Sequence, residues 1–477
     1  MSEPLWTRAE IEAAIEGAVG AGVPGASGAS IDTRTLAPGD LYFAIKGDVH
    51  DGHDFVGSAL DKGAAAAIVS AEKASSFAGS DRLIVVPDVL KAMRQLGIAA
   101  RARSHAKIVA ITGSVGKTGT KEAMRIALSQ QGRTNASVAS YNNHWGVPLT
   151  LARLPREAEF GIFEIGMNHA HEILPLTAMV RPHVAVVTTI EPVHIEFFPS
   201  MWGIADAKGE IFSGLQPGGT AVLNRDSIYF ERLRTHALAS AAGRVVTFGE
   251  HAQADIRAER ILVTPDGSAV EAMIYGCPLS YRIGTAGRHI ALNSLSVLAT
   301  VHALGADVVR AARAFGDLKP PVGRGERTML SMGEGAVLLI DESYHAHPAS
   351  VRAALSNLGA VELGRQGRRI AVLGDMKELG HEGPGLHEAL ASEVEKNKID
   401  LVFTAGPLMT NLVSRLPNTM VAAHADSSAE LIEAVCETLR PGDAVMVKGS
   451  LSMKMALIVK ALKERYGAGA LAAALKG

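Results

Sequence analysis

Short apolar runs, many of them rich in β-branched residues, recur along the chain between polar segments that contain glycine. In residues 1–106 this pattern predicts strands at 41–45, 67–69 and 83–86 and a helix over 91–104. The alternation begins again at Lys107, where strands are predicted at 160–165, 184–190, 220–223 and 245–248 with helices between several of them. Such alternation is typical of a mostly parallel sheet that carries helices on both faces.

The pattern changes after residue 255. Residues 255–284 are predicted to form turn-separated strands at an antiparallel edge of the sheet, followed by a helix over 288–304. The proline- and glycine-rich segment 319–325 is predicted to be a linker. After it the alternation starts a third time, with strands at 337–341, 370–373, 401–404, 420–422 and 444–447 and helices beginning near Pro348, Leu386, Pro407, Ala429 and Met453.

These three stretches predict an α/β protein of three domains. They are a small N-terminal α/β domain (1–106), a central domain with a P-loop-type sheet (107–321) and a C-terminal Rossmann-like domain (322–477). A chain of 477 residues is too long for a single hydrophobic core, which agrees with this division.

Charge and composition restrict the partners and the compartment. A net charge of −2 argues against general nucleic-acid binding, which needs clustered basic residues. The two cysteines, Cys277 and Cys436, lie far apart in the sequence, as is typical of a reducing compartment. The first residues lack a basic-then-apolar signal region, and no run reaches the ~18 apolar residues of a membrane span. We therefore expect a soluble, cytoplasmic monomer with small-molecule substrates and no nucleic-acid or membrane partner.

The most informative segment joins a strand to a helix at residues 109–121. After an apolar run ending at Thr112, the chain continues with Gly113, Ser114, Val115, Gly116, Lys117, Thr118 and Gly119. Glycines allow backbone N–H groups to converge on an anion, the lysine reaches the outer phosphates, and the threonine hydroxyl can bind Mg²⁺. The glycine that the commonest phosphate-binding pattern has five residues before Gly116 is replaced by Ile111. A simple glycine-rich turn with a surface lysine is the alternative.

Two polar residues follow neighbouring apolar strands. Glu164 ends the strand at 160–165, where a carboxylate beside a phosphate loop could hold Mg²⁺ or could simply cap a helix. His194 follows the strand at 184–190 and is either a packing residue or a ligand. Both interpretations remain open at each position.

Lys208 lies on an apolar helical stripe. Within the predicted helix 202–212 it shares one face with Ile204, Ile211 and Phe212, which predicts partial burial and a lowered pKa. A neutral amine could take up CO₂ and become an anionic carbamate ligand. Alternatively, the ammonium could extend along the apolar surface to water, and the pattern alone favours this second interpretation.

Several residues of the later strand ends could contact a nucleotide. His289 and Asn293 share one helix face, where the amide could pair with adenine or both could simply be solvated. Arg324 in the linker could reach a phosphate, and Lys448 could bind an anion or merely start a helix. Asp341 precedes a turn in which His345 and His347 could suggest a metal site, but no third ligand stands at a recognisable spacing.

Taken together, these residues resemble those of the Mur ligase family. The resemblance runs from about residue 30 to about residue 455, and its motifs follow one another in the family's order. They are Asp32-Thr33-Arg34, Pro38-Gly39-Asp40, Gly47 with Asp51 to Phe55, Ser140 to Thr150, Glu164 to Asn168, His194, Ala207 to Phe212, Asn224, Gly287 to His289 with Asn293, Gly323-Arg324, Gly374 to Gly380, and Lys448-Gly449-Ser450.

The resemblance implies an ATP-dependent ligase that uses Mg²⁺, with two ions. The segment 140–150 is similar to that of members that add D-alanyl-D-alanine to a UDP-muramoyl-tripeptide, and it argues against the tripeptide-forming and glutamate-adding members. Thr118, Glu164, His194 and a carbamylated Lys208 would hold the metal, and Lys117, Lys208 and His194 would be catalytic. The loop 113–119, His289, Asn293, Arg324 and Asp341 would bind the nucleotide. The other substrates would contact Asp32, Thr33, Arg34, Gly47, Asn142, Asn143, Lys448 and Ser450.

Two departures from the family pattern affect nucleotide or dipeptide contacts. The family usually has Asn-Ala-Asn-Pro where this chain has His345-Ala346-His347-Pro348, and an arginine where this chain has Leu451. A P-loop kinase or GTPase and a non-catalytic nucleotide-binding regulator are the alternative classes. Asn397-Lys398-Ile399-Asp400 matches the guanine-specifying pattern Asn-Lys-x-Asp, so this pattern does not exclude a GTPase. The candidate metal ligands argue against a regulator. The sequence leaves open whether the third peptide residue is meso-diaminopimelate or lysine.

Overall fold

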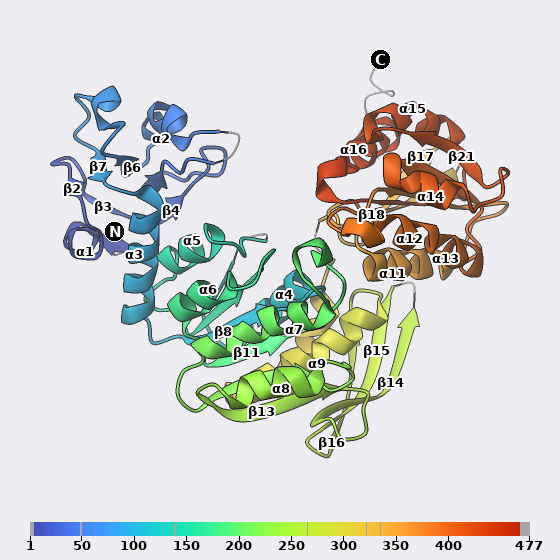
Figure 1. The fold of residues 1–477 in the computed structure, drawn as a ribbon, viewed down its shortest axis with the longest axis horizontal. Helices are drawn as coiled ribbons and strands as arrows, with labels where there is room; N and C mark the ends of the chain where they lie inside the picture. The colour runs from blue at the N-terminus through green and yellow to red at the C-terminus, as the bar shows by residue number, and fades with distance from the viewer. Residues whose placement is uncertain are drawn as a thin grey trace.

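The computed structural model describes residues 4–47, 50–137, 140–264, 266–320, 322–333 and 335–467. Its sheets form three groups along the chain, shown at the upper left, the bottom and the upper right of Figure 1. No helix among the described residues is long and apolar enough to cross a membrane.

The first group combines a five-stranded sheet with a small antiparallel pair. The pair is β1 (Trp6–Thr7) with β3 (Gly25–Ala26), and the sheet has the order β2 (Ala18–Val19), β7 (Leu83–Val86), β6 (Ala66–Ser70), β5 (Asp40–Phe43), β4 (Gly28–Ser30). α1 (Arg8–Ala14) and α3 (Val89–Arg103) share one apolar core, and α2 (Val56–Asp61) belongs to another. A capping box between Thr7 and Glu10 starts α1.

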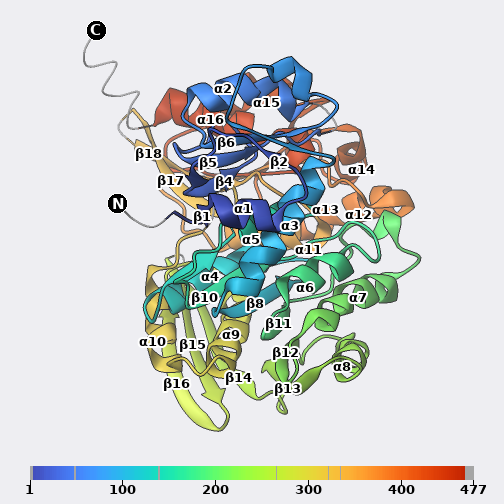
Figure 2. The same cartoon turned by 90° about the vertical axis from the view of Figure 1, so that its left-hand side faces the viewer.

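The central group is a nine-stranded sheet. Its order is β16 (Cys277–Ile283), β15 (Gly267–Ile274), β14 (Ile256–Thr264), β13 (Ala242–Gly249), β12 (Gly219–Asn224), β11 (Val184–Val187), β8 (Lys107–Thr112), β10 (Phe160–Glu164), β9 (Thr134–Ala136). Strands β14 to β16 pair antiparallel, and the remaining pairs are parallel, so the predicted antiparallel edge is confirmed. In Figure 1 these three strands lie on the side of the central group away from the first group, and Figure 2 shows them at the lower left.

Helices cover both faces of this sheet, as predicted. Alternate side chains of β8 enter different cores, with Val109 and Ile111 on one side and Ile108 and Ala110 on the other. The first core also contains α4 (Lys117–Ser129), α9 (Arg288–Ala303) and α10 (Val308–Ala314). The second contains α5 (Gly146–Ala152), α6 (Ile173–Val180), α7 (Met201–Gly209) and α8 (Phe230–Leu238).

The third group is a six-stranded sheet that is parallel except at one edge. Its order is β17 (Glu326–Met332), β18 (Gly335–Glu342), β22 (Ala444–Lys448), β19 (Arg369–Gly374), β20 (Leu401–Ala405), β21 (Val421–Ala425). One face packs against α11 (Pro348–Gly359), α13 (Leu390–Lys396) and α14 (Thr410–Val413), next to α12 (Gly383–Glu388). The other packs against α15 (Ser428–Thr438) and α16 (Ala456–Tyr466).

Some predicted elements differ in extent. The predicted helix 202–212 is α7, which ends at Gly209 and continues as a 3₁₀ turn over Glu210–Gly214. The strand predicted at 184–190 ends at Val187, because the residues after it hold the phosphate loop instead of pairing further. Strands β1 to β4 were not predicted, since they are two or three residues long and lack an apolar run.

The predicted domain boundaries stay predictions. The first falls between α3 and β8, yet Leu149 and Ala152 of α5 belong to the same core as α3. Residue 321 and the last ten residues of the predicted third domain, 468–477, lie outside the described residues.

Candidate functional site

The glycine-rich loop lies between β8 and α4 and needs both of its inner glycines. Gly113 and Gly116 have φ angles of 148° and 83°. A Cβ at Gly113 would lie 1.9 Å from the Thr188 hydroxyl, and one at Gly116 would lie 2.2 Å from Asn293 Nδ2. The loop is thus packed tightly between the end of β11 and α9, and larger residues would displace it.

Residues after β11 hold the loop in place. The Ser114 amide donates to the Thr189 carbonyl at 2.8 Å, and the Thr188 hydroxyl donates to the Val115 carbonyl at 2.6 Å. The Ser114 hydroxyl also donates to the Glu191 carbonyl at 2.9 Å. These bonds fix the turn that leads into the N-terminus of α4, where an anion is favoured.

Lys117 folds back over the loop. Its ammonium donates to the Gly113 carbonyl at 2.6 Å. Burial lowers the pKa of Lys117 to about 8, and the nearby Arg324 cation acts in the same direction, against the attraction of Glu164. A phosphate placed on the loop would compensate the charge of this partly buried ammonium.

Glu164 is buried behind the loop with two partners. Its carboxylate accepts the Thr118 hydroxyl at 3.0 Å and Asn142 Nδ2 at 2.7 Å, and the residue is 1 % exposed. A carboxylate and a hydroxyl oxygen side by side are a donor set that fits Mg²⁺. Asn142, predicted to contact substrate, therefore also holds the candidate metal ligand Glu164.

Lys208 is enclosed by the core below α7. The residue is 2 % exposed and makes no hydrogen bond or ion pair within the described part of the chain. Burial, together with the charge of Lys117, lowers the pKa of Lys208 far below its ordinary value. Burial of this residue therefore favours a neutral amine, which could react with CO₂.

His194 connects the central sheet to the third group. It stands in a left-handed conformation with φ 60°, and its Nδ1 pairs with the carboxylate of Glu378. No hydrogen bond joins His194 to Lys208 within the described residues, and these contain no group of three or more His, Cys, Asp or Glu placed to hold a metal ion. An added carbamate on Lys208 would supply one of the missing oxygen ligands.

A cavity of about 330 Å³ extends from the loop to the third sheet. Its lining includes the predicted nucleotide residues Gly116, Gly119, His289, Asn293 and Arg324, and also Asn224, His345, His347 and Lys448. The Arg324 guanidinium lies 4.6 Å from the centre of the Tyr344 ring. Asp341 is not among the lining residues: it is buried and accepts hydrogen bonds from the amide and hydroxyl of Ser343.

Lys448 enters this cavity from the end of β22. Its ammonium contacts the Glu342 carboxylate at 3.2 Å and donates to the His345 carbonyl at 2.8 Å. Ser450, its predicted companion, instead accepts the Lys377 amide at 2.9 Å. Ser450 does not line the cavity.

The other predicted substrate residues lie near the junction of the first and central groups. Asp32 is paired with Arg34 at 2.6 Å, and Thr33 accepts the Lys62 ammonium through its carbonyl. A Cβ on Gly47 would lie 3.3 Å from the Trp145 ring, which places Gly47 beside the segment 140–150. Asn143 caps α5 by accepting the Gly146 amide at 2.9 Å.

Sequence analysis assigned no role in the site to Thr188, Glu342 or Glu378, although Glu378 lies within the motif 374–380 that carries the resemblance. Thr188 directly follows β11, so its place at a strand end could have indicated it. Glu378 and Glu342 contact residues far away in the sequence, and no local pattern indicates such pairs.

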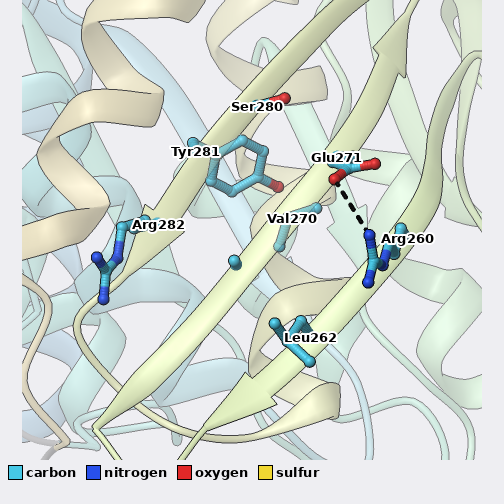
Figure 3. Close-up of a pocket in the computed structure, with 8 residues that line it drawn as sticks. Arg260, Leu262, Val270, Glu271, Ser280, Tyr281 and Arg282 are labelled. Atoms are coloured by element: carbon cyan, nitrogen blue, oxygen red, sulfur yellow. Dashed lines mark ion pairs between the residues drawn. The ribbon is translucent and has the colours of Figure 1, made fainter.

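A second concavity of about 280 Å³ lies on the antiparallel strands β14 to β16, as Figure 3 shows. Arg260 and Glu271 form an ion pair of 3.8 Å across it, and Leu262 and Arg282 add to its lining. None of the predicted site residues lines it.

Comparisons with known proteins match nearly the whole chain. Three family models match in order: the Mur ligase family catalytic domain at residues 26–106, the Mur ligase middle domain at 111–301 and the Mur ligase glutamate ligase domain at 323–451. Among curated proteins, UDP-N-acetylmuramoyl-tripeptide–D-alanyl-D-alanine ligase of Rickettsia prowazekii is 31% identical, covering 90% of this chain and 93% of its own. The Escherichia coli protein of that name is 33% identical, covering 91% and 93%.

Solved structures give the same result. A crystal structure of MurF from Acinetobacter baumannii has a TM-score of 0.82 and 26% identity, covering 97% of this chain and 100% of its own. MurF ligase from Thermotoga maritima in complex with ADP has a TM-score of 0.73 and 24% identity, covering 92% and 98%.

Proposed function

This chain belongs to the Mur ligase family, and on that premise we propose that it joins D-alanyl-D-alanine to the terminal carboxylate of UDP-N-acetylmuramoyl-tripeptide at the expense of ATP. The observation that carries the proposal is the match to ligases of that name over 90% of the chain or more. The loop with its partly buried Lys117 and the Thr118–Glu164 pair supports it, because they are suited to a magnesium-bound triphosphate. The product would be a precursor of peptidoglycan.

The reaction proceeds in two displacement steps. In the first, a carboxylate oxygen of the tripeptide attacks the γ-phosphorus of ATP, ADP leaves, and an acyl phosphate forms. In the second, the amine of D-alanyl-D-alanine attacks the acyl carbon, phosphate leaves with that oxygen, and the amine loses a proton. Lys117 would offset the repulsion between the two anions of the first step.

The residues that would hold Mg²⁺ are Thr118 and Glu164 for one ion and His194 and carbamylated Lys208 for a second. Bound there, Mg²⁺ supplies positive charge to the phosphoryl oxygens. The carbamate would form from the neutral Lys208 amine and CO₂ with release of a proton. Support for it comes from the deep burial of Lys208 and its lack of a partner among the described residues.

We propose that the three predicted domains divide the work. Residues 1–106, with Asp32, Thr33, Arg34 and Gly47, would bind the UDP-sugar, and residues 107–321 would bind ATP. Residues 322–477 would bring Arg324 to the phosphates and would place Lys448 and Ser450 toward the dipeptide. Asp341 would support the turn that follows it. Aligning three reactants in this way contributes several orders of magnitude to the rate. Because two of the three substrates are nucleotides and both cysteines are free, we place the reaction in the cytoplasm.

Incubation with ATP, Mg²⁺, UDP-muramoyl-tripeptide and D-alanyl-D-alanine tests this function. We expect a product whose mass exceeds that of the tripeptide substrate by one D-alanyl-D-alanine less one water, together with one ADP and one phosphate. Without the dipeptide, steady phosphate release should be absent, whereas a kinase or a simple ATPase would not need it. Parallel reactions with the meso-diaminopimelate and lysine tripeptides identify the third residue. Failure to form any amide product would contradict the proposal.

The contact between His194 and Glu378 gives a separate prediction. His194 Nδ1 is held by this carboxylate, and the hydrogen bond from His194 lowers the pKa of Glu378. If the other ring nitrogen binds metal, Glu378→Gln should raise the half-saturating Mg²⁺ concentration about 10-fold or more, because an outer partner orients a ligating histidine. Initial rates against Mg²⁺ concentration measure this.

The matched control is Glu382→Gln, which removes an exposed carboxylate from the nearby turn Gly380–Glu382. It should leave the Mg²⁺ dependence unchanged. An unchanged dependence in Glu378→Gln would remove His194 from the metal site.

A further inference from the structure

His347 carries a buried ring nitrogen without a partner. The residue is 2 % exposed, and its Nε2 makes no hydrogen bond within the described part of the chain. His347 lines the cavity that runs from the glycine-rich loop to the third sheet. Leaving a buried polar atom unpaired is costly, so such an atom on a cavity wall indicates a ligand that pairs with it.

The local structure decides whether this nitrogen donates or accepts. His347 is the N-cap of α11, and its Nδ1 faces the Ser350 amide at 3.4 Å, while the Ser350 hydroxyl accepts the His347 amide at 3.0 Å. Because a backbone N–H can only donate, Nδ1 must be free of a proton.

The ring is held neutral as well. Burial lowers the pKa of His347 far below its ordinary value, and the neighbouring His345 and the cations Lys448, Lys117 and Arg352 act in the same direction. A neutral imidazole whose Nδ1 accepts carries its single proton on Nε2. The unpaired atom is therefore a donor, and its missing partner is an acceptor.

The cavity wall near His347 indicates which part of a nucleotide offers that acceptor. The loop end at Gly116 suits the phosphates, because it lies at the N-terminus of α4. The wall formed by α11 carries the small apolar side chains of Ala349, Ala353 and Ala354 beside the polar Ser350 and Asn357, and Ile290 of α9 also lines the cavity. Such surfaces accommodate a flat heterocycle, whose remaining recognition must come from a few polar atoms at its edge.

We propose that His347 donates its Nε2 proton to a ring nitrogen of the purine base and thereby makes this chain selective for a purine nucleotide. The inference rests on the proposed function only in that ATP occupies this cavity. It assigns a base contact to a histidine at one of the two positions where the chain departs from the asparagines usual in the family.

Binding of deaza nucleotides tests this contact in the unmodified protein. Dissociation constants of ADP and of its 1-deaza, 3-deaza and 7-deaza analogues are measured by titration calorimetry with Mg²⁺ present. One analogue, which lacks the accepting nitrogen, should bind about 5- to 20-fold more weakly than ADP, and the other two within about twofold of it. Since no peptide substrate is needed, the result does not depend on ligation.

The variant His347→Ser separates the base contact from the helix cap. Serine can still cap α11, but its short side chain cannot reach the base. In this variant ADP should bind about as weakly as the sensitive analogue does to the unmodified protein, and that analogue should lose no further affinity. The control His105→Ser changes an exposed histidine outside the cavity and should keep the discrimination among analogues.

Three outcomes would overturn the inference. In the first, ADP and all three analogues bind the unmodified protein equally tightly. In the second, His347→Ser still discriminates among the analogues. In the third, the only affinity that depends on His347 is the one lost with 2′-deoxy-ADP. If the protein binds no ADP at all, the proposed function fails together with the inference. ADP binding without discrimination leaves the function intact and removes only the role of His347.

Discussion

Replacing Lys117 with alanine abolishes ATP-dependent ligation and leaves the protein folded. Among the described residues, the Lys117 ammonium donates hydrogen bonds only to carbonyls of its own loop, Gly113 and Ser114, so its loss removes no core packing. It also removes a positive charge from the place where negative charge accumulates between phosphate and carboxylate. Loss of one such preorganised group lowers kcat by about 10²–10³-fold, and weaker ATP binding adds to this in kcat/KM. Phosphate release dependent on D-alanyl-D-alanine measures the effect, and thermal unfolding checks the fold.

Arg125→Ala is the matched control for Lys117→Ala. Arg125 lies on the same helix, is exposed and, in the part of the chain that the structure describes, pairs only with Glu122. We expect this variant to retain activity within about twofold, since surface substitutions of this kind rarely matter. Ligation by Lys117→Ala at a tenth of the normal rate or more would show that the loop does not bind the reacting phosphates.

Replacing Lys208 with alanine also abolishes ligation, but for a different reason, and small carboxylates restore part of the activity. If the role of Lys208 is to carry a carbamate, acetate or propionate can enter the space left by the side chain and place an oxygen ligand there. The rescue should rise with carboxylate concentration and should be absent in Lys117→Ala. A fully active Lys208→Ala variant would end the carbamate proposal.

Two further measurements separate a carbamate from a structural lysine. Protein kept in ¹³C-bicarbonate should show a carbamate carbon signal that is missing from Lys208→Met. Methionine preserves most of the volume of this buried side chain and removes an amine that makes no hydrogen bond within the described residues, so Lys208→Met should be as stable as the unmodified protein or more so. Inactivity combined with full stability would exclude a purely structural role.

Much of the fold follows from local signals in the sequence. The inner strands of the central and third sheets are apolar runs buried on both faces, as the two-sided packing of β8 shows, and they were predicted nearly to their ends. The short edge strands were not predicted, because two or three residues are too few to show an alternation of apolar and polar positions. Helix α7 ended earlier than its apolar stripe, since the chain tightens into a 3₁₀ turn after Gly209.

The candidate site was predictable as far as strand ends determine it. Thr118, Glu164 and Asn142 meet because β8 and β10 are parallel neighbours, whose carboxyl ends lie at one edge of the sheet. The pair of His194 with Glu378 and that of Lys448 with Glu342 join residues 184 and 106 positions apart, respectively. Periodicity and spacing carry no information on such contacts.

The histidines His345 and His347, where the chain departs from the family pattern, also show what the sequence alone cannot predict. The sequence identifies two histidines in a turn before a helix and cannot tell a metal site from a cap. The structure makes His347 the N-cap of α11 and leaves one of its nitrogens facing no protein partner among the described residues. Tertiary burial, rather than the motif, gives that histidine its chemistry.

The central claim is that the γ-phosphoryl group of ATP passes to the peptide carboxylate in the pocket of Lys117 and Glu164. The most direct measurement uses UDP-muramoyl-tripeptide whose terminal carboxylate carries oxygen-18, followed by mass spectrometry of the phosphate released during ligation. We predict one labelled oxygen in each inorganic phosphate and none in ADP. Unlabelled phosphate, or label found in AMP, would contradict the account.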